Sequence, residues 1–362
     1  MKKPNGMFRF ILTALLFIFL NCTSITAQEK KYYFYSGKKY GTESQFNPLS
    51  LILNGSYDVA QIEGVGRDIT KYPYRHASRE IFRNLTDPIF SIRSYGTQHF
   101  FMDQILPINF TPNHGQWWPN YNLHLLGGGM VYARTTEWYV YHGFPAPVLF
   151  SIGTMAAYHL MNEIVENGNF AGPNVDPIAD IYFFDIGGMI LFSFDAVKEF
   201  FSEKVILADW SFQPSFSLRD GTLRNNGQYF SFKWKFPSSD KWHLFYLAGI
   251  DAIVGTSYKT DEFSMFSVGF GFRNKKFEVL DAGKNRLTAK LVWNVGIFYD
   301  RENSLLASAF FSGTYADAAT LNIYPGVVHL GNFSPGFFVT VSQKGEPTFG
   351  ITTRWTPGIA WN

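Results

Sequence analysis

Cysteine is almost missing from the chain, and its absence excludes several kinds of chemistry. The only cysteine in the 362 residues is Cys22. It lies in an N-terminal stretch that we expect to be removed during export. The mature chain would then have no disulfide framework, no thiol nucleophile and no thiolate metal site.

The chain also lacks an excess of charge of one sign. It has 31 Lys and Arg residues against 29 Asp and Glu residues, which gives a formal net charge of +2. A general nucleic-acid-binding protein would show a basic excess or a basic stripe. The composition therefore predicts that nucleic acid is not a partner.

Long hydrophobic runs are missing once the first twenty residues are passed. The positive residues Lys2, Lys3 and Arg9 come first, an apolar run covers 10–20, and a short polar stretch ends at Ala27. This is the layout of a secretory signal peptide, and the apolar run is shorter than the ~20 residues that a membrane-spanning helix needs. We predict a signal peptide over residues 1–27. A lipoprotein cleaved before Cys22 is the alternative, but Asn21 is bulkier than such sites usually accept.

Aromatic residues are abundant, by contrast. They make up 19% of the chain, with 38 Phe, 20 Tyr and 9 Trp, while the mean hydropathy is only −0.07. A β-barrel that faces lipid outside and a wetter interior inside needs many aromatic residues without a high average hydrophobicity. The best later candidate for a spanning helix, residues 178–194, carries Asp180 and Asp185, which are costly at bilayer depth. These features favour a β-barrel of the outer membrane.

From Leu207 onward, large apolar residues recur at every second position. Examples are Phe230, Phe232, Trp234 and Phe236; Phe266, Val268, Phe270 and Phe272; and Phe349, Ile351, Thr353 and Trp355. A strand sorts such residues onto one face, whereas a helix would scatter them. We predict eight to ten strands between Leu207 and Trp361, within an antiparallel transmembrane β-barrel of about 10–14 strands whose main part is residues 204–362. A soluble periplasmic β-sandwich predicts the same alternation, but a core of such large rings would be hard to fill without voids.

The part before residue 204 follows other patterns. Residues 28–120 mix short apolar runs with Pro and Gly and predict loops and the first barrel strands. Residues 121–203 predict a helical block, with helices over 123–141, 150–166 and 178–201. Its apolar character favours burial, so the block could plug the lumen of the barrel, lie in the membrane interface or sit in the periplasm.

Three segments of this helical block carry a resemblance to a known family. They are Trp118-Pro-Asn-Tyr-Asn-Leu-His124-Leu-Leu-Gly-Gly-Gly-Met, then His159-Leu-Met-Asn-Glu163-Ile-Val-Glu166, then Asp176-Pro-Ile-Ala-Asp180 through Asp185-Ile-Gly-Gly188. Together they resemble a domain-of-unknown-function family of Gram-negative, chiefly bacteroidete, envelope proteins. The resemblance implies an envelope location and this architecture, and it brings no reaction with it.

The polar residues of the helical block are the candidates for chemistry. His159 and Glu163 are four residues apart and share a helix face, and His124 precedes three glycines that allow close backbone approach. His124, His159 and Glu163 could form a catalytic site with a histidine base, and Asp180 and Asp185 could bind a divalent metal ion. The alternative is a structural network, since buried polar groups must find partners. The sequence identifies no cofactor.

Asp176 and the glycine triplet have plainer interpretations. Pro177 indicates that Asp176 is a helix N-cap. Gly127, Gly128 and Gly129 favour helix packing over phosphate binding.

The main functional prediction is a non-enzymatic outer-membrane protein for envelope structure, assembly or limited transport. Its expected partners are outer-membrane lipid and other envelope proteins. The alternative is a membrane-embedded hydrolase that acts on envelope lipid or cell-wall material through the His/Glu/Asp site.

Overall fold

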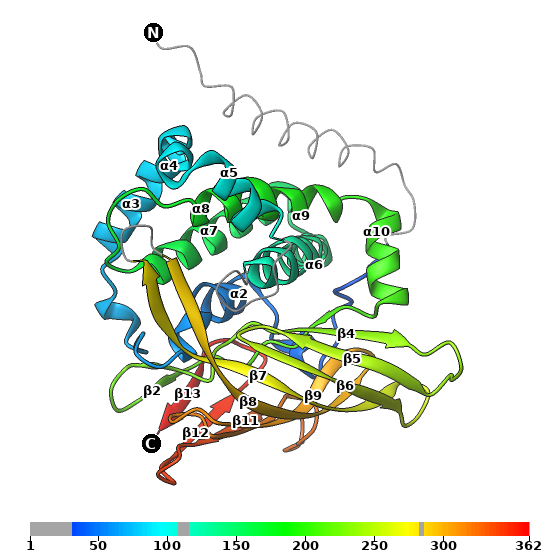
Figure 1. Cartoon of the computed structure of the whole chain (residues 1–362). Helices are drawn as coiled ribbons and strands as arrows, with labels where there is room; N and C mark the ends of the chain where they lie inside the picture. Colours follow the sequence, from blue (N-terminus) through cyan, green and yellow to red (C-terminus); the bar gives the residue numbers. More distant parts are fainter. Residues whose placement is uncertain (1–30, 108–115, 282–285, 362) are drawn as a thin grey trace.

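The computed structural model describes residues 31–107, 116–281 and 286–361. The predicted signal peptide and Cys22 lie outside these residues. Helices gather on one side of the molecule and a large sheet forms the other side, with the long β7–β8 hairpin rising from the sheet toward the helices (Figure 1).

Within the described residues the sheet has thirteen strands, and all of them come after residue 207. They are β1 (Ala208–Asp209), β2 (Ser215–Ser217), β3 (Leu223–Arg224), β4 (Phe230–Lys235), β5 (Trp242–Ala248), β6 (Asp251–Lys259), β7 (Ser264–Asp281), β8 (Arg286–Arg301), β9 (Ser304–Ser312), β10 (Ala319–Ile323), β11 (Gly336–Val341), β12 (Pro347–Thr352) and β13 (Gly358–Trp361). The hydrogen-bonded order is β1-β4-β5-β6-β7-β8-β9-β10-β11-β12-β13-β2-β3. All neighbours are antiparallel except β13 and β2, which are parallel. The prediction of a mainly β, largely antiparallel region is confirmed.

The two ends of this order are formed by one hairpin, residues 208–235. Its first stretch contains β1 and β2 and its second contains β3 and β4, and the stretches stay paired between the named strands. Trp210 N donates to Tyr229 O at 2.8 Å and Phe212 N donates to Gly227 O at 2.9 Å. The second stretch pairs with β5 through β4, while the first pairs with β13 through β2.

The two faces of the sheet differ in polarity. One face exposes large apolar side chains along successive strands, among them Trp234, Leu244, Val254, Phe266, Phe270, Phe272, Trp293, Phe311, Leu321, Phe349, Ile359 and Trp361. The alternate positions are buried and include many polar residues, among them Lys233, His243, Asp251, Ser257, Ser267, Arg273, Asn294, Asp300, Ser308, Asn322 and Thr352. Aromatic side chains such as Trp210, Phe245 and Phe298 fill the space between them. The apolar face of the sheet is therefore exposed on the surface of the molecule, and the polar face is buried.

The N-terminal segment is helical, so the prediction of first barrel strands in residues 28–120 was wrong for the described residues. It contains η1 (Thr42–Gln45), α2 (Pro48–Leu51), η2 (Ile52–Ser56), η3 (Asp58–Gln61), η4 (Ile69–Lys71), α3 (Tyr74–Thr86), α4 (Pro88–Tyr95), α5 (Thr97–His99) and η5 (Phe100–Ile105). The Pro residues that suggested loops instead begin helices: Asn47 caps a helix that starts at Pro48, and Asp87 caps one that starts at Pro88. A capping side chain followed by Pro is a normal helix start.

The central block contains the predicted helices, with one break. Its elements are η7 (Trp118–Gly128), α6 (Gly129–Tyr141), α7 (Pro147–Asn167), α8 (Asp176–Ala179), η8 (Asp180–Asp185), α9 (Ile186–Leu191), α10 (Asp195–Glu199) and η9 (Phe200–Lys204). The helix predicted over 178–201 is bent by 87° between Leu191 and Asp195. Among the described helices, α7 is long and apolar enough to cross a membrane, and 44% of its apolar window is buried in the molecule.

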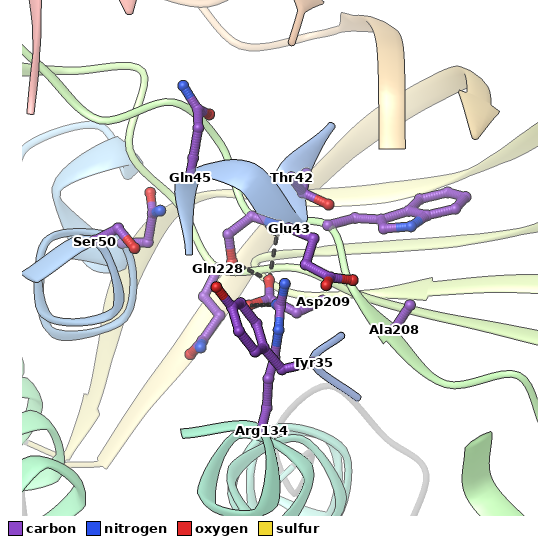
Figure 2. A network of polar contacts seen from close by, with 12 residues as sticks. Tyr35, Thr42, Glu43, Gln45, Ser50, Arg134, Ala208, Asp209 and Gln228 are labelled. Carbon is purple, nitrogen blue, oxygen red and sulfur yellow. Dashed lines mark hydrogen bonds and ion pairs between the residues drawn. The ribbon is translucent and has the colours of Figure 1, made fainter. Parts of the chain in front are cut away.

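The helical block packs against the 208–235 hairpin. Phe230 of β4 joins the helical core of Met130, Val131 and Tyr158. Arg134 of α6 forms a buried ion pair with Asp209 of β1 at 2.6 Å. In Figure 2 the Arg134 side chain leaves α6 and reaches Asp209 beside Tyr35.

Candidate functional site: a histidine and carboxylate cluster

All five residues that the sequence singled out meet in the helical block. His124 comes from η7, His159 and Glu163 from α7, and Asp180 and Asp185 from η8. Four of these side chains are nearly fully buried, while His124 stays 12% exposed. The five residues are thus brought together from three helices.

Glycines explain how α9 comes close to the junction of η7 and α6, which helps to build this cluster. A Cβ on Gly129 would lie 2.7 Å from the carbonyl oxygen of Gly188, and a Cβ on Gly188 would lie 2.5 Å from that of Leu125. Any side chain at either position would push the two helices apart. Of the glycine triplet, Gly129 thus serves helix packing, while a Cβ on Gly127 would instead meet Phe230 of β4. The close approach at Gly129 and Gly188 sets His124 beside Asp185.

The backbone of η7 and η8 is π-helical, with hydrogen bonds that span five residues. This geometry is rare and occurs frequently at functional sites, because the wider turn changes the direction of side chains relative to an α-helix. His124, Asp180 and Asp185 all lie on these two segments.

Asp185 is the centre of the cluster, since it contacts both histidines. Its Oδ1 lies 2.9 Å from His124 Nδ1, and its Oδ2 lies 3.0 Å from His159 Nδ1. The other ring nitrogen of His124, Nε2, lies 3.6 Å from Asp180 Oδ2. We call His124, His159 and Asp185 the histidine triad.

Glu163 belongs to a second group. It lies with Asp176 and Asp180, and oxygens of the three residues are within 4.8 Å of one another. Asn167 donates to Glu163 at 3.2 Å, and Gln116 donates to Asp176 at 3.0 Å. We call Glu163, Asp176 and Asp180 the carboxylate triad.

Two details of the sequence prediction need correction. His159 contacts Asp185 of a neighbouring helix, and no ion pair or side-chain hydrogen bond joins it to Glu163 among the described residues. Asp176 does not cap α8, because the N-cap residue is Val175 and no side chain caps that end. In both cases the partners of the side chain are determined by packing between helices and not by residue spacing within one helix.

Several buried atoms of the cluster have no hydrogen-bond partner. They are both ring nitrogens of His159, Asp180 Oδ1 and Asp185 Oδ2. The 3.0 Å contact between His159 and Asp185 therefore lacks the geometry of a hydrogen bond. A buried polar group without a partner costs about 1–3 kcal/mol, so such groups need an explanation.

Carboxyl groups in the cluster outnumber basic groups. Besides the two triads, Asp58 and Glu166 lie close enough for the charge of His124 to act on both. Among the described residues, none of these six carboxylates forms an ion pair with Lys or Arg; their only ion-pair partners are His124 and His159. Sequence reasoning missed Asp58 and Glu166 as members. Glu166 follows His159 by seven residues and so shares its helix face, whereas nothing in the sequence pointed to Asp58.

Burial and neighbouring charges shift pKa values in the cluster. Burial lowers the pKa of His124, but Asp180 and Asp185 outweigh burial and raise this pKa to about 10. Burial raises the pKa of Asp58 to about 7. A positive charge is thus favoured at His124. The surrounding described carboxylates have no Lys or Arg partner to balance a negative charge.

A second polar region lies where α6 meets the sheet, around a small cavity of about 120 Å³. Its charged residues have partners in the protein: Arg134 pairs with Asp209 at 2.6 Å and Lys38 pairs with Glu43 at 3.2 Å. Figure 2 shows Arg134, Asp209 and Glu43 meeting between α6, the N-terminal segment and β1. The region joins helices to sheet through these two ion pairs.

No protein-family model, no curated protein and no solved structure matches the chain. The resemblance to an envelope family of bacteroidetes, stated above, stays a prediction.

Proposed function

We propose that the chain is an outer-membrane protein whose strands close into a transmembrane β-barrel with a helical domain packed on its wall. The observation that carries the proposal is the polarity of the sheet. Phe266, Phe270 and Phe272 stand exposed on one face of β7, while Ser267 and Arg273 are buried on the other. Transmembrane barrels have this arrangement, whereas a soluble sandwich buries its large apolar face.

The pairing of the 208–235 hairpin supports closure. The hairpin pairs with β5 on one side and with β13 on the other. The bonds Trp210 N to Tyr229 O and Phe212 N to Gly227 O hold its two stretches together between the short strands. Because this one hairpin pairs with strands at both ends of the sheet order, it can close the sheet into a ring without free edges.

The test is the behaviour of the chain in membranes. We expect the protein to stay in the outer-membrane pellet after salt and carbonate washes. We also expect it to migrate differently on a gel before and after boiling, because a closed barrel stays compact in cold detergent. A chain that is released by carbonate and stays soluble without detergent would refute the proposal.

A second candidate function is hydrolysis of envelope lipid or cell-wall material. The observation in its favour is the buried imidazole of His159, which lies beside Asp185 and has no hydrogen-bond partner. His159→Gln and Glu163→Gln, made singly and together, separate catalysis from structure. Normal folding with loss of lipid turnover supports a catalytic role, and loss of folded protein supports a structural one.

A further inference from the structure

We propose that His124, His159 and Asp185 bind one divalent transition-metal ion in the helical block. Two imidazole nitrogens and one carboxylate oxygen are a donor set that such ions accept, and three protein ligands leave a coordination position open for water or substrate. The inference does not depend on insertion of the sheet into a membrane.

The distances in the histidine triad agree with a shared ion. Two ligand atoms at about 2.1 Å from one ion are roughly 3.0–3.4 Å apart for angles between octahedral and tetrahedral. His159 Nδ1 and Asp185 Oδ2 are 3.0 Å apart and neither has a hydrogen-bond partner. The ligand atoms of all three residues lie within 4.8 Å of one another. Two polar atoms at this distance whose contact lacks hydrogen-bond geometry are expected where both atoms are ligands of one metal ion.

A purely structural network accounts for only part of the cluster. A protonated His124 between Asp185 and Asp180 would be a satisfied ion pair, with contacts of 2.9 and 3.6 Å. That network leaves His159 unexplained, because both of its ring nitrogens are buried without a hydrogen-bond partner, although Nδ1 lies 3.0 Å from Asp185 Oδ2. An ion bound at His159 gives that ring a function and gives the excess of carboxylates a counter-charge.

The choice of the histidine triad follows from donor chemistry. The carboxylate triad of Glu163, Asp176 and Asp180 offers only oxygen atoms, which suit magnesium, calcium or manganese. Imidazole nitrogens favour zinc, cobalt, iron, nickel or copper. A cobalt or zinc ion should therefore enter the site that contains both histidines.

The experiment is a titration of the full chain, purified in detergent and freed of metal with a chelator. Cobalt(II) serves as the probe because its visible absorption reports nitrogen and oxygen ligands, and zinc(II) is added afterwards to displace it. We expect one cobalt ion per chain, displaced by one zinc ion.

Variants then locate the ion. Asp185→Asn and His159→Gln should weaken cobalt binding more than about 100-fold, beyond the 10–100-fold effect of residues that only orient a ligand. Two matched controls should bind within about threefold of the parent chain, a tolerance well below that lower bound. Glu166→Gln removes a carboxylate of the same cluster outside the triad, and His243→Gln removes a buried histidine of β5.

The outcomes are distinct. Stoichiometric binding that Asp185→Asn or His159→Gln abolishes and both controls keep supports the proposal. Absence of cobalt absorption in the parent chain overturns it, and so does equal weakening in Glu166→Gln, which would indicate a diffuse acidic region. If Asp185→Asn does not fold, His124→Gln and His159→Gln decide the matter, with near-ultraviolet circular dichroism as the check on folding.

Discussion

Charged side chains are buried in two regions of this molecule, and the regions handle charge differently. On the buried face of the sheet, each acidic residue meets a basic one: Lys233 Nζ lies 2.7 Å from Asp300, and Arg273 lies 3.6 Å from Asp251. In and beside the helical block, six carboxylates lie near two imidazoles, and none of the six pairs with Lys or Arg among the described residues.

The difference separates a structural role from a binding role. A buried ion pair that is complete inside the protein needs nothing from outside, and removing one partner leaves a costly isolated charge. A group of carboxylates without enough cations is unfavourable until a proton or a metal ion joins it. We therefore expect charge removal to destabilise the sheet and to stabilise the metal-free helical block.

The largest expected effect is in the sheet. Lys233→Met leaves Asp300 buried without its cation and should lower the free energy of unfolding by about 3–5 kcal/mol. Lys235→Met is the matched control, because Lys235 lies two residues further along β4 and its partner Asp240 is exposed, so its pair contributes at most about 1 kcal/mol. Urea unfolding in detergent measures both. Similar losses for the two variants would contradict the contrast.

The next effect is on the exposed face of the same sheet. Phe270→Arg should cost about 2–4 kcal/mol in a lipid bilayer if this face contacts hydrocarbon near its midplane. Leu218→Arg, at an exposed position of the β2–β3 turn, should change stability by less than about 0.5 kcal/mol. Unfolding of protein folded into lipid vesicles measures the pair. A Phe270→Arg variant as stable as the parent would argue against lipid contact.

The helical block should respond in the opposite direction. Glu163→Gln removes one carboxylate that faces Asp176 and Asp180, while its amide oxygen can still accept from Asn167. In chelator we expect a gain of about 1–3 kcal/mol, the usual cost of a buried polar group whose interactions are unsatisfied. The midpoint of thermal unfolding reports the change. A loss of stability comparable to that of Lys233→Met would show that the negative charge of the carboxylate triad is already balanced within the protein.

The smallest effect concerns the helix crossing that holds the cluster. Gly129→Ala should cost about 1–3 kcal/mol, because the new methyl group meets Phe192 and the Gly188 carbonyl. It should also weaken cobalt binding by displacing η7. Gly153→Ala on α7 has open space at the same atom and should be neutral or stabilise by up to about 1 kcal/mol, as Ala favours helix. Equal changes in stability for the two variants would show that close packing at Gly129 is not important.

The sequence predicted the sheet better than it predicted the site. The alternation around Phe230 and Phe270 is a local signal, because pleating alone sorts neighbours onto two faces. The helices before residue 107 escaped notice since Pro48 and Pro88 begin helices at positions where Pro can also mean a loop.

The site depends on contacts between helices, which spacing along one helix does not contain. His159 and Glu163 share a face of α7, yet they join different triads because Asp185 and Asp176 approach from other segments. The members were predictable as polar residues in an apolar block. Their partners were fixed by the Gly129–Gly188 crossing, which only the packed molecule reveals.

The N-terminal segment has a consequence for how the chain assembles. Gln45 Nε2 donates to Thr352 Oγ1 at 2.8 Å across 307 residues of sequence, and Gly41 N donates to Pro325 O at 2.7 Å. Contacts between such distant positions form late, because the entropy of closing the intervening loop must be overcome first. We therefore expect the N-terminal segment to gain its contacts with the sheet only after the last strands have formed.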